Sequence, residues 1–119
     1  MHEVGMAMRR RLLGDDGAEA LAKAEAISPK MARWMIENLF GEVFGDDTLD
    51  LKTRSLCTLS ALIVLGNEGP LGNHIRGALR IGITKEELSA LITHMLWYAG
   101  LPAAFRALGI LMSELAKQK

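Results

Sequence analysis

The chain has 119 residues, with 14 lysines and arginines against 14 aspartates and glutamates; half of the residues are hydrophobic and 5% are aromatic. This length fits a single domain over residues 1–119. The balanced charge leaves no basic excess to hold a nucleic acid or an anionic membrane surface, so neither is an expected partner. A core of Leu, Ile, Ala and Met rather than aromatic rings is typical of packed helices.

The longest apolar run, around Leu56 to Leu65, is about half as long as the roughly 20 residues needed to span a bilayer, so it predicts a core element. Arg9, Arg10 and Arg11 near the N-terminus are not followed by an apolar signal segment, so we expect a cytoplasmic protein. The single cysteine, Cys57, excludes an intramolecular disulfide and a Cys-x-x-Cys pair. Its place inside the apolar run favours a small buried side chain over a catalytic thiol.

Glycine, proline and aspartate divide the chain into segments of helical length, and almost nothing alternates with the period of a strand. The first segments predict helices at about 3–13 and 18–26, separated by a turn. Ser28 and Pro29 suit the N-cap and first position of a third helix, which should run to about Phe44. Four apolar residues of this helix, spaced four apart, predict the face toward the core: Met31, Met35, Leu39 and Val43.

The second half of the chain predicts helices at about 50–65, 71–81, 84–98 and 103–117. Asp50 can cap the first of these, which is apolar on nearly all sides and is therefore expected at the centre of the fold or at a subunit interface. Gly82 is a suitable C-terminal cap, and Thr84 with Glu87 has the form of a capping box. The sequence therefore predicts an all-α fold of six or seven helices, with sequence neighbours packed antiparallel.

Few motifs carry obvious chemistry. The chain has no phosphate-binding glycine loop, no His-Glu-x-x-His motif and no nucleophile elbow, so neither a metal site nor a hydrolase is supported. Polar groups in apolar helices remain as candidates. His74 has apolar residues one turn away on both sides and should face inward, whereas His94 and Tyr98 are four apart and share a helix face. Arg54, at the start of the central helix, would need a carboxylate partner or a substrate anion if it were buried.

The two histidines and the tyrosine also have a purely structural interpretation. His74 and His94 could each be a hydrogen-bonded group of the core or of an interface. Tyr98 could be a packed ring with its hydroxyl at a polar rim. Periodicity alone does not choose between these interpretations and a functional one.

The other notable side chains have simple structural interpretations as well. Arg54 could form an ion pair with Asp50 or Glu42. Trp34 and Trp97 are interpreted as packing residues. A site is therefore not defined by these positions on physical grounds alone.

Four segments resemble the carboxymuconolactone decarboxylase family in order and in spacing, over about residues 40–115. They are Leu49–Leu56, His74–Leu79, Gly82–Leu88, and His94 together with Tyr98–Ala104. The resemblance implies an alkylhydroperoxidase D-like helical bundle that assembles into homo-oligomers, with a trimer or a hexameric ring expected. An oligomer agrees with the presence of an all-apolar helix in so short a chain.

In the peroxidase branch of these proteins a Cys-x-x-Cys pair precedes a histidine. Setting that histidine on His74 places the cysteine positions at Asn67 and Pro70, neither of which can form a thiolate. Reduction of peroxides by a dithiol pair is therefore excluded. A hydroperoxidase that relies on Cys57 alone is a third interpretation, with nothing nearby in sequence to activate the thiol.

The decarboxylase branch implies a cofactor-independent lyase that removes carbon dioxide from a small carboxylated lactone, such as 4-carboxymuconolactone in aromatic catabolism. No metal or cofactor is expected, because the unsaturated lactone carbonyl can accept the electron pair. By this resemblance His74 is the catalytic proton donor or oxyanion partner. Arg54 or Arg76 would hold a substrate carboxylate, and His94 with Tyr98 would line the pocket.

The sequence departs from the family pattern near the expected pocket. Phe44 and Asp46–Thr48 replace a tryptophan and an Arg-Pro pair, and Pro70-Leu71 replaces a Glu-Leu pair. These changes leave another lactone or a β-keto-type acid open as the substrate. The alternative is a non-catalytic helical oligomer that binds an acidic metabolite or a partner.

Overall fold

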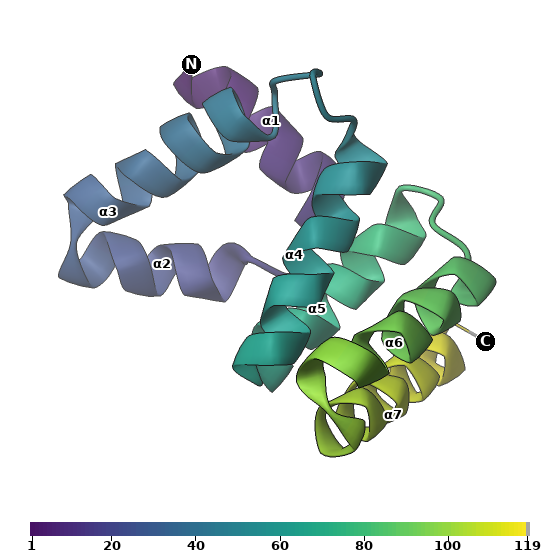
Figure 1. The fold of residues 1–119 in the computed structure, drawn as a ribbon. Helices are drawn as coiled ribbons and strands as arrows, with labels where there is room; N and C mark the ends of the chain where they lie inside the picture. The colour runs from purple at the N-terminus through teal and green to yellow at the C-terminus, as the bar shows by residue number, and fades with distance from the viewer. Residues whose placement is uncertain (119) are drawn as a thin grey trace. The chain divides into compact units, whose positions relative to one another are not determined.

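The computed structural model describes residues 1–118, and within them every regular element is a helix (Figure 1). The chain divides into two compact units, one ending at Leu51 and one beginning at Lys52. The elements are α1 (His2–Leu13), α2 (Ala18–Ile27), α3 (Pro29–Trp34), η1 (Met35–Val43), α4 (Leu51–Leu65), α5 (Glu68–Arg80), α6 (Lys85–Ala99) and α7 (Leu101–Lys117). The predicted all-α fold with up to seven α-helices is confirmed, whereas the single domain over 1–119 stays a prediction.

In the N-terminal unit, α1 and η1 meet backbone to backbone at Gly5. A Cβ atom on this glycine would lie 1.9 Å from the carbonyl oxygen of Ile36. Two helices can approach this closely only where one of them lacks a side chain. On the η1 side the aromatic rings of Phe40 and Phe44 stack, with their centroids 5.4 Å apart.

The predicted core face of the third helix is wrong. Met31, Leu39 and Val43 are exposed and Met35 is only partly buried, whereas the residues next to them are buried: Ala32, Ile36, Phe40 and Phe44. Both sets are apolar and spaced four apart, so the spacing fits either face equally well. The contact at Gly5 decides between them, because it brings α1 onto the side of Ile36.

The same helix changes its hydrogen-bonding pattern along its length. It is α-helical to Trp34 and π-helical over η1, where the N–H of Phe44 donates to the carbonyl of Leu39 at 2.8 Å. The predicted start of the helix is confirmed, because Ser28 Oγ accepts from the N–H of Met31 at 3.2 Å with Pro29 at the first position. The wider turns beyond residue 34 were not predicted by the sequence pattern.

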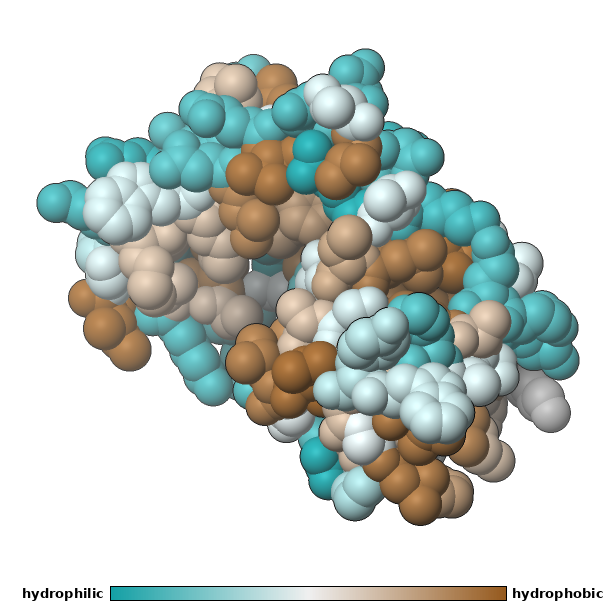
Figure 2. Space-filling view, in the orientation of Figure 1, coloured by the Kyte–Doolittle hydropathy of each residue, from teal (hydrophilic) through white to brown (hydrophobic). Residues whose placement is uncertain are grey.

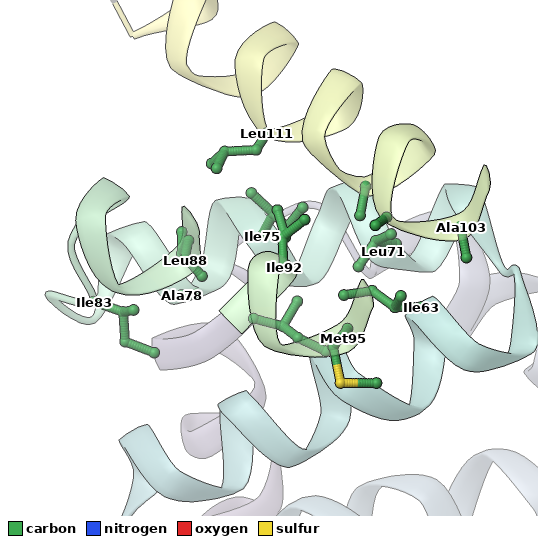
Figure 3. Close-up of a cluster of buried hydrophobic side chains, with 13 residues drawn as sticks. Ile63, Leu71, Ile75, Ala78, Ile83, Leu88, Ile92, Met95, Ala103 and Leu111 are labelled. Atoms are coloured by element: carbon green, nitrogen blue, oxygen red, sulfur yellow. The ribbon is translucent and has the colours of Figure 1, made fainter. Parts of the chain in front are cut away.

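In the C-terminal unit, α4 to α7 surround one hydrophobic core (Figure 3). Its buried residues are Leu59, Ile63, Leu71, Ile75, Ala78, Ile83, Leu88, Ile92, Met95, Ala103, Ala104, Ala107 and Leu111. Helices α6 and α7 run antiparallel on either side of Gly100, as Figure 1 shows. None of the described helices is long and apolar enough to cross a membrane.

The predicted helix boundaries in this unit are confirmed at the caps and corrected at two prolines. Thr84 and Glu87 form the expected capping box, and Gly82 has a positive φ of 98° after the end of α5. The predicted starts of α5 and α7 are late, because Pro70 and Pro102 lie inside the first helical turn rather than before it. The first turn tolerates proline, since its N–H would have no intrahelical partner there.

Several residues that were predicted to be buried are exposed. On α4 only one stripe, Ser55, Leu59 and Ile63, is buried, and Cys57 lies on the exposed side. Trp34 and Trp97 were interpreted as packing residues, but they are 52% and 84% exposed. The apolar character of a residue in the sequence does not show which surface, if any, covers its side chain in the folded chain.

A buried carboxylate joins α5 to α7. Glu114 accepts from Arg76 Nε at 2.7 Å and from Arg76 Nη2 at 3.1 Å, and Lys117 Nζ donates to it at 3.1 Å. The hydrogen bonds from Arg76 hold the pKa of the Glu114 carboxyl below its usual value. Replacing Glu114 by glutamine should lower the free energy of unfolding by about 2–4 kcal/mol, because the Arg76 guanidinium loses its counter-charge.

Urea denaturation of both proteins at several pH values checks this expectation. A carboxyl with a lowered folded pKa adds stability above its unfolded pKa and loses it as the pH falls through the folded value. The difference between wild type and Glu114→Gln should therefore be largest near pH 7 and vanish in acid. Glu68→Gln is the matched control, since Glu68 pairs with Arg106 between the same helices at 3.5 Å on the exposed surface and should cost under about 1 kcal/mol. Equal losses in the two variants would refute the assignment.

Candidate functional site

His74 lies at the edge of the buried face of α5, next to Ile75 and one turn from Leu71 and Ala78. The imidazole is half-buried, and its Nδ1 atom is buried with no hydrogen-bond partner in the described part of the chain. The solvent-accessible part of the ring is therefore on the Nε2 side. This placement agrees with the predicted inward orientation and leaves one ring nitrogen available to a ligand.

Burial lowers the pKa of His74 from its usual value near 6.5, because the imidazolium form loses hydration that the neutral form needs less. The lowered pKa favours the neutral form of the ring at pH 7. A neutral imidazole carries one N–H donor and one acceptor nitrogen. Of the two predicted roles, a hydrogen bond to an oxyanion suits this state better than storage of an acidic proton.

The two candidate arginines are both partly buried. The guanidinium of Arg76, on the other edge of the buried face of α5, binds both carboxylate oxygens of Glu114. Arg76 thus has an internal carboxylate partner in this structure. Arg54 is half-buried in the first turn of α4, and its carbonyl oxygen accepts from Thr58 Oγ1 at 3.0 Å.

His94 and Tyr98 share a face of α6, as predicted, with ring centroids 5.1 Å apart. Both lie on the outer side of the helix, and Tyr98 is 71% exposed rather than packed. The core side of α6 is formed instead by Leu88, Ile92 and Met95. The structure therefore brings His94 and Tyr98 together but turns them away from the core that His74 borders.

In Figure 2 apolar surface lies along the lower edge of the α6–α7 pair, below paler and hydrophilic residues. A hollow of about 150 Å³ lies between the two helices, lined by Ile92, Thr93, Leu96, Leu101, Ala104, Phe105 and Leu108. The Thr93 hydroxyl donates to the carbonyl of Ser89 at 2.9 Å and is not directed to a ligand. The hollow thus offers contact area without catalytic groups.

Two further observations limit the chemistry. Among residues 1–118 no group of three or more His, Cys, Asp or Glu side chains is placed to hold a metal ion. The thiol of Cys57 is exposed, which corrects the prediction of a buried one. The exposure of the Cys57 thiol does not by itself assign a function to this residue.

Ser55 is a buried polar residue that was not among the predicted site residues. It is 2% exposed, and its Oγ atom has no hydrogen-bond partner in the described residues. The sequence did contain one indication of its burial, because Ser55 lies four residues before Leu59 and eight before Ile63 on the same helix face. This face could not be identified from the sequence, because α4 carries apolar residues on several sides.

The fold and site define an all-helical protein with a half-buried histidine at the edge of its core and no cysteine pair before it. The sequence profile of the carboxymuconolactone decarboxylase family matches residues 29–112. The 4-carboxymuconolactone decarboxylase of Acinetobacter baylyi is 33% identical over 108 residues, which cover 90% of this chain and 81% of that protein. The chain therefore belongs to the carboxymuconolactone decarboxylase family.

Two other relatives extend the comparison. A nitrosuccinic acid decarboxylase of Metarhizium robertsii is 31% identical over 109 residues, covering 91% of this chain and 76% of that protein. An uncharacterized 15.0 kDa protein of Paracoccus denitrificans is 38% identical over 96 residues, covering 79% and 72% of the two chains. The chain is thus similar to decarboxylases named for two different acids.

Proposed function

We propose that the protein is a cofactor-independent decarboxylase of a small acid, with a carboxylated lactone such as 4-carboxymuconolactone from aromatic catabolism as the leading substrate. The observation that supports this most is the half-buried His74, whose Nδ1 atom is buried without a partner beside an apolar core, in a chain that lacks the dithiol pair. The similarity to two decarboxylases supports the reaction type more than the substrate.

The proposed reaction needs few protein groups. The bond between the carboxylate carbon and its neighbour breaks, carbon dioxide leaves, and the electron pair passes into the conjugated lactone carbonyl as an enolate. The carbon then takes up one proton, which solvent delivers directly or through His74. The ring N–H of neutral His74 would donate to the enolate oxygen, where negative charge develops during the reaction.

The names of the two decarboxylase relatives suggest a common chemical class of substrate. A lactone carbonyl and a nitro group can each accept the electron pair that departing carbon dioxide leaves behind. A β-keto acid shares this property. The proposed substrate class is therefore a small acid whose carboxylate sits next to, or in conjugation with, such an acceptor.

Arg54 or Arg76 is proposed to hold a second carboxylate of the substrate. Arg76 is bound to Glu114 and would have to exchange that contact for the substrate. A guanidinium can bind a carboxylate through two parallel hydrogen bonds, which would fix the orientation of the substrate.

A homo-oligomer of the alkylhydroperoxidase D-like type, a trimer or a hexamer in the cytoplasm, completes the proposal. The outer side of α6 and α7 carries Trp97, Tyr98, Leu101 and Phe105, which are between 55% and 84% exposed. Large apolar surface of this kind is typical of interaction sites. In such an assembly His94 and Tyr98 would line a pocket that one chain alone leaves open.

Release of carbon dioxide from purified protein tests the proposal. 4-Carboxymuconolactone, nitrosuccinic acid and a β-keto acid would be supplied separately, and carbon dioxide measured against protein-free samples. Turnover of at least one of them is expected.

Two other outcomes would support the alternative functions. Tight binding of one of these acids without release of carbon dioxide would support the non-catalytic oligomer. In a separate assay, peroxide consumption that is abolished by alkylation of Cys57 would support the single-thiol hydroperoxidase.

A further inference from the structure

The described residues of the C-terminal unit contain two buried side-chain polar atoms without a hydrogen-bond partner, Ser55 Oγ and His74 Nδ1. Leaving a buried polar atom unpaired typically costs about 1–3 kcal/mol. Such atoms are therefore rare in folded proteins, and each one calls for an explanation. The two unpaired atoms lie on consecutive helices, α4 and α5. This suggests that a single explanation accounts for both.

Ser55 differs from Thr58 and Ser60, two other hydroxyl residues of its helix. Thr58 Oγ1 donates to the carbonyl of Arg54 at 3.0 Å, and Ser60 Oγ donates to that of Leu56 at 2.9 Å. This bond to the carbonyl four residues earlier is the usual way to satisfy a helical hydroxyl. Ser55 does not make it, although its side chain is the most buried of the three. Its O–H is thus available inside the protein.

Helix packing relates Ser55 to His74. Two residues, Gly66 and Asn67, join α4 to α5. Leu59 of α4 and Ile75 of α5 line one hollow of about 10 Å³. Ser55 lies one turn before Leu59 on the same buried stripe, and His74 directly precedes Ile75. Both unpaired atoms therefore belong to residues within one helical turn of side chains that line this hollow.

We propose that Ser55 is a positioning residue for His74, whose Nδ1 atom it holds through ordered water so that the ring presents an Nε2–H to the ligand. Water can accept the proton of the hydroxyl and donate to Nδ1, which satisfies both buried atoms. When Nδ1 accepts, the single proton of the neutral ring resides on Nε2. This is the tautomer that can donate to an enolate oxygen on the accessible side.

The tautomer of His74 can be measured without substrate. Nitrogen-15 NMR of histidine-labelled protein near pH 7.5 distinguishes the two ring nitrogens, and His74→Gln identifies the signals of His74 among the three histidines. In the wild type we expect Nε2–H to dominate Nδ1–H by about tenfold, the amount that one hydrogen bond can contribute. Ser55→Ala should bring the ratio close to one, and Ser55→Thr should restore it.

Ser60→Ala is the matched control, because it removes a hydroxyl that is bound to the backbone of the same helix. It should leave the tautomer of His74 unchanged, and backbone NMR spectra verify the fold of each variant. The proposal is overturned if Ser55→Ala keeps the wild-type ratio or if Nδ1–H dominates in the wild type. The catalytic meaning rests on the proposed function, yet a shifted tautomer in a protein that releases no carbon dioxide would refute the decarboxylase alone.

Discussion

Replacing His74 by phenylalanine is expected to lower kcat for decarboxylation by about 10²- to 10³-fold, the usual effect of removing one oxyanion donor. Phenylalanine fills the volume of the imidazole beside Ile75 but has no N–H to donate. His74→Gln should recover part of the activity at most, because its amide N–H does not occupy the position of Nε2. Initial rates of carbon dioxide release and circular dichroism spectra would be compared for the three proteins.

The pH dependence of the wild type provides a second readout. Because burial lowers the pKa of His74, the neutral ring persists as the pH falls through its usual value near 6.5. The rate should therefore stay constant through that pH and decline only as the pH falls through the lowered pKa. His2→Gln is the control, since His2 is an exposed histidine hydrogen-bonded to Glu37. Full turnover by the folded phenylalanine variant would remove His74 from the mechanism.

Replacing Trp97 by glutamate is expected to convert the proposed homo-oligomer into smaller species. The indole is 84% exposed in one chain, and the side chains of Leu101 and Phe105 are exposed as well. A tryptophan at the centre of an interface commonly contributes 2 kcal/mol or more, or about 30-fold in Kd, and a buried unpaired carboxylate adds a further cost. Light scattering coupled to size-exclusion chromatography would give the mass over a range of concentrations.

Ile27 supplies a matched control for this substitution. It is also 84% exposed, but it lies at the end of α2 in the N-terminal unit. Ile27→Glu should retain the wild-type mass if α6 and α7 form the interface. An unchanged mass for Trp97→Glu, or a wild-type protein that is monomeric at all concentrations, would contradict the assignment.

Local signals in the sequence predicted most of the helix boundaries. A cap needs only residues within one turn of each other, and Ser28 with Pro29 and Thr84 with Glu87 are examples that the structure confirms. The starts of α5 and α7 were predicted a few residues late, because proline suits the first turn as well as the position before it.

Features that depend on distant residues were not predictable in the same way. Spacing could not select Ile36 over Met35 as a core residue, because the selection depends on a contact with Gly5 far away in sequence. The pairing of Arg76 with Glu114 joins residues 38 apart. The candidate site was found through the family motif around His74, whereas Ser55 became visible only once burial and hydrogen bonds could be examined together.

The contact between α1 and η1 reverses the usual rule for tolerance to mutation. Most buried positions suffer when atoms are removed, but at Gly5 the addition of a single methyl group would force two main chains apart. The close packing of α1 against η1 thus depends on the missing side chain at Gly5. Positions of α1 that do not face η1 can vary in size more freely. Substitutions at Gly5 should therefore be tolerated poorly, although they add atoms rather than remove them.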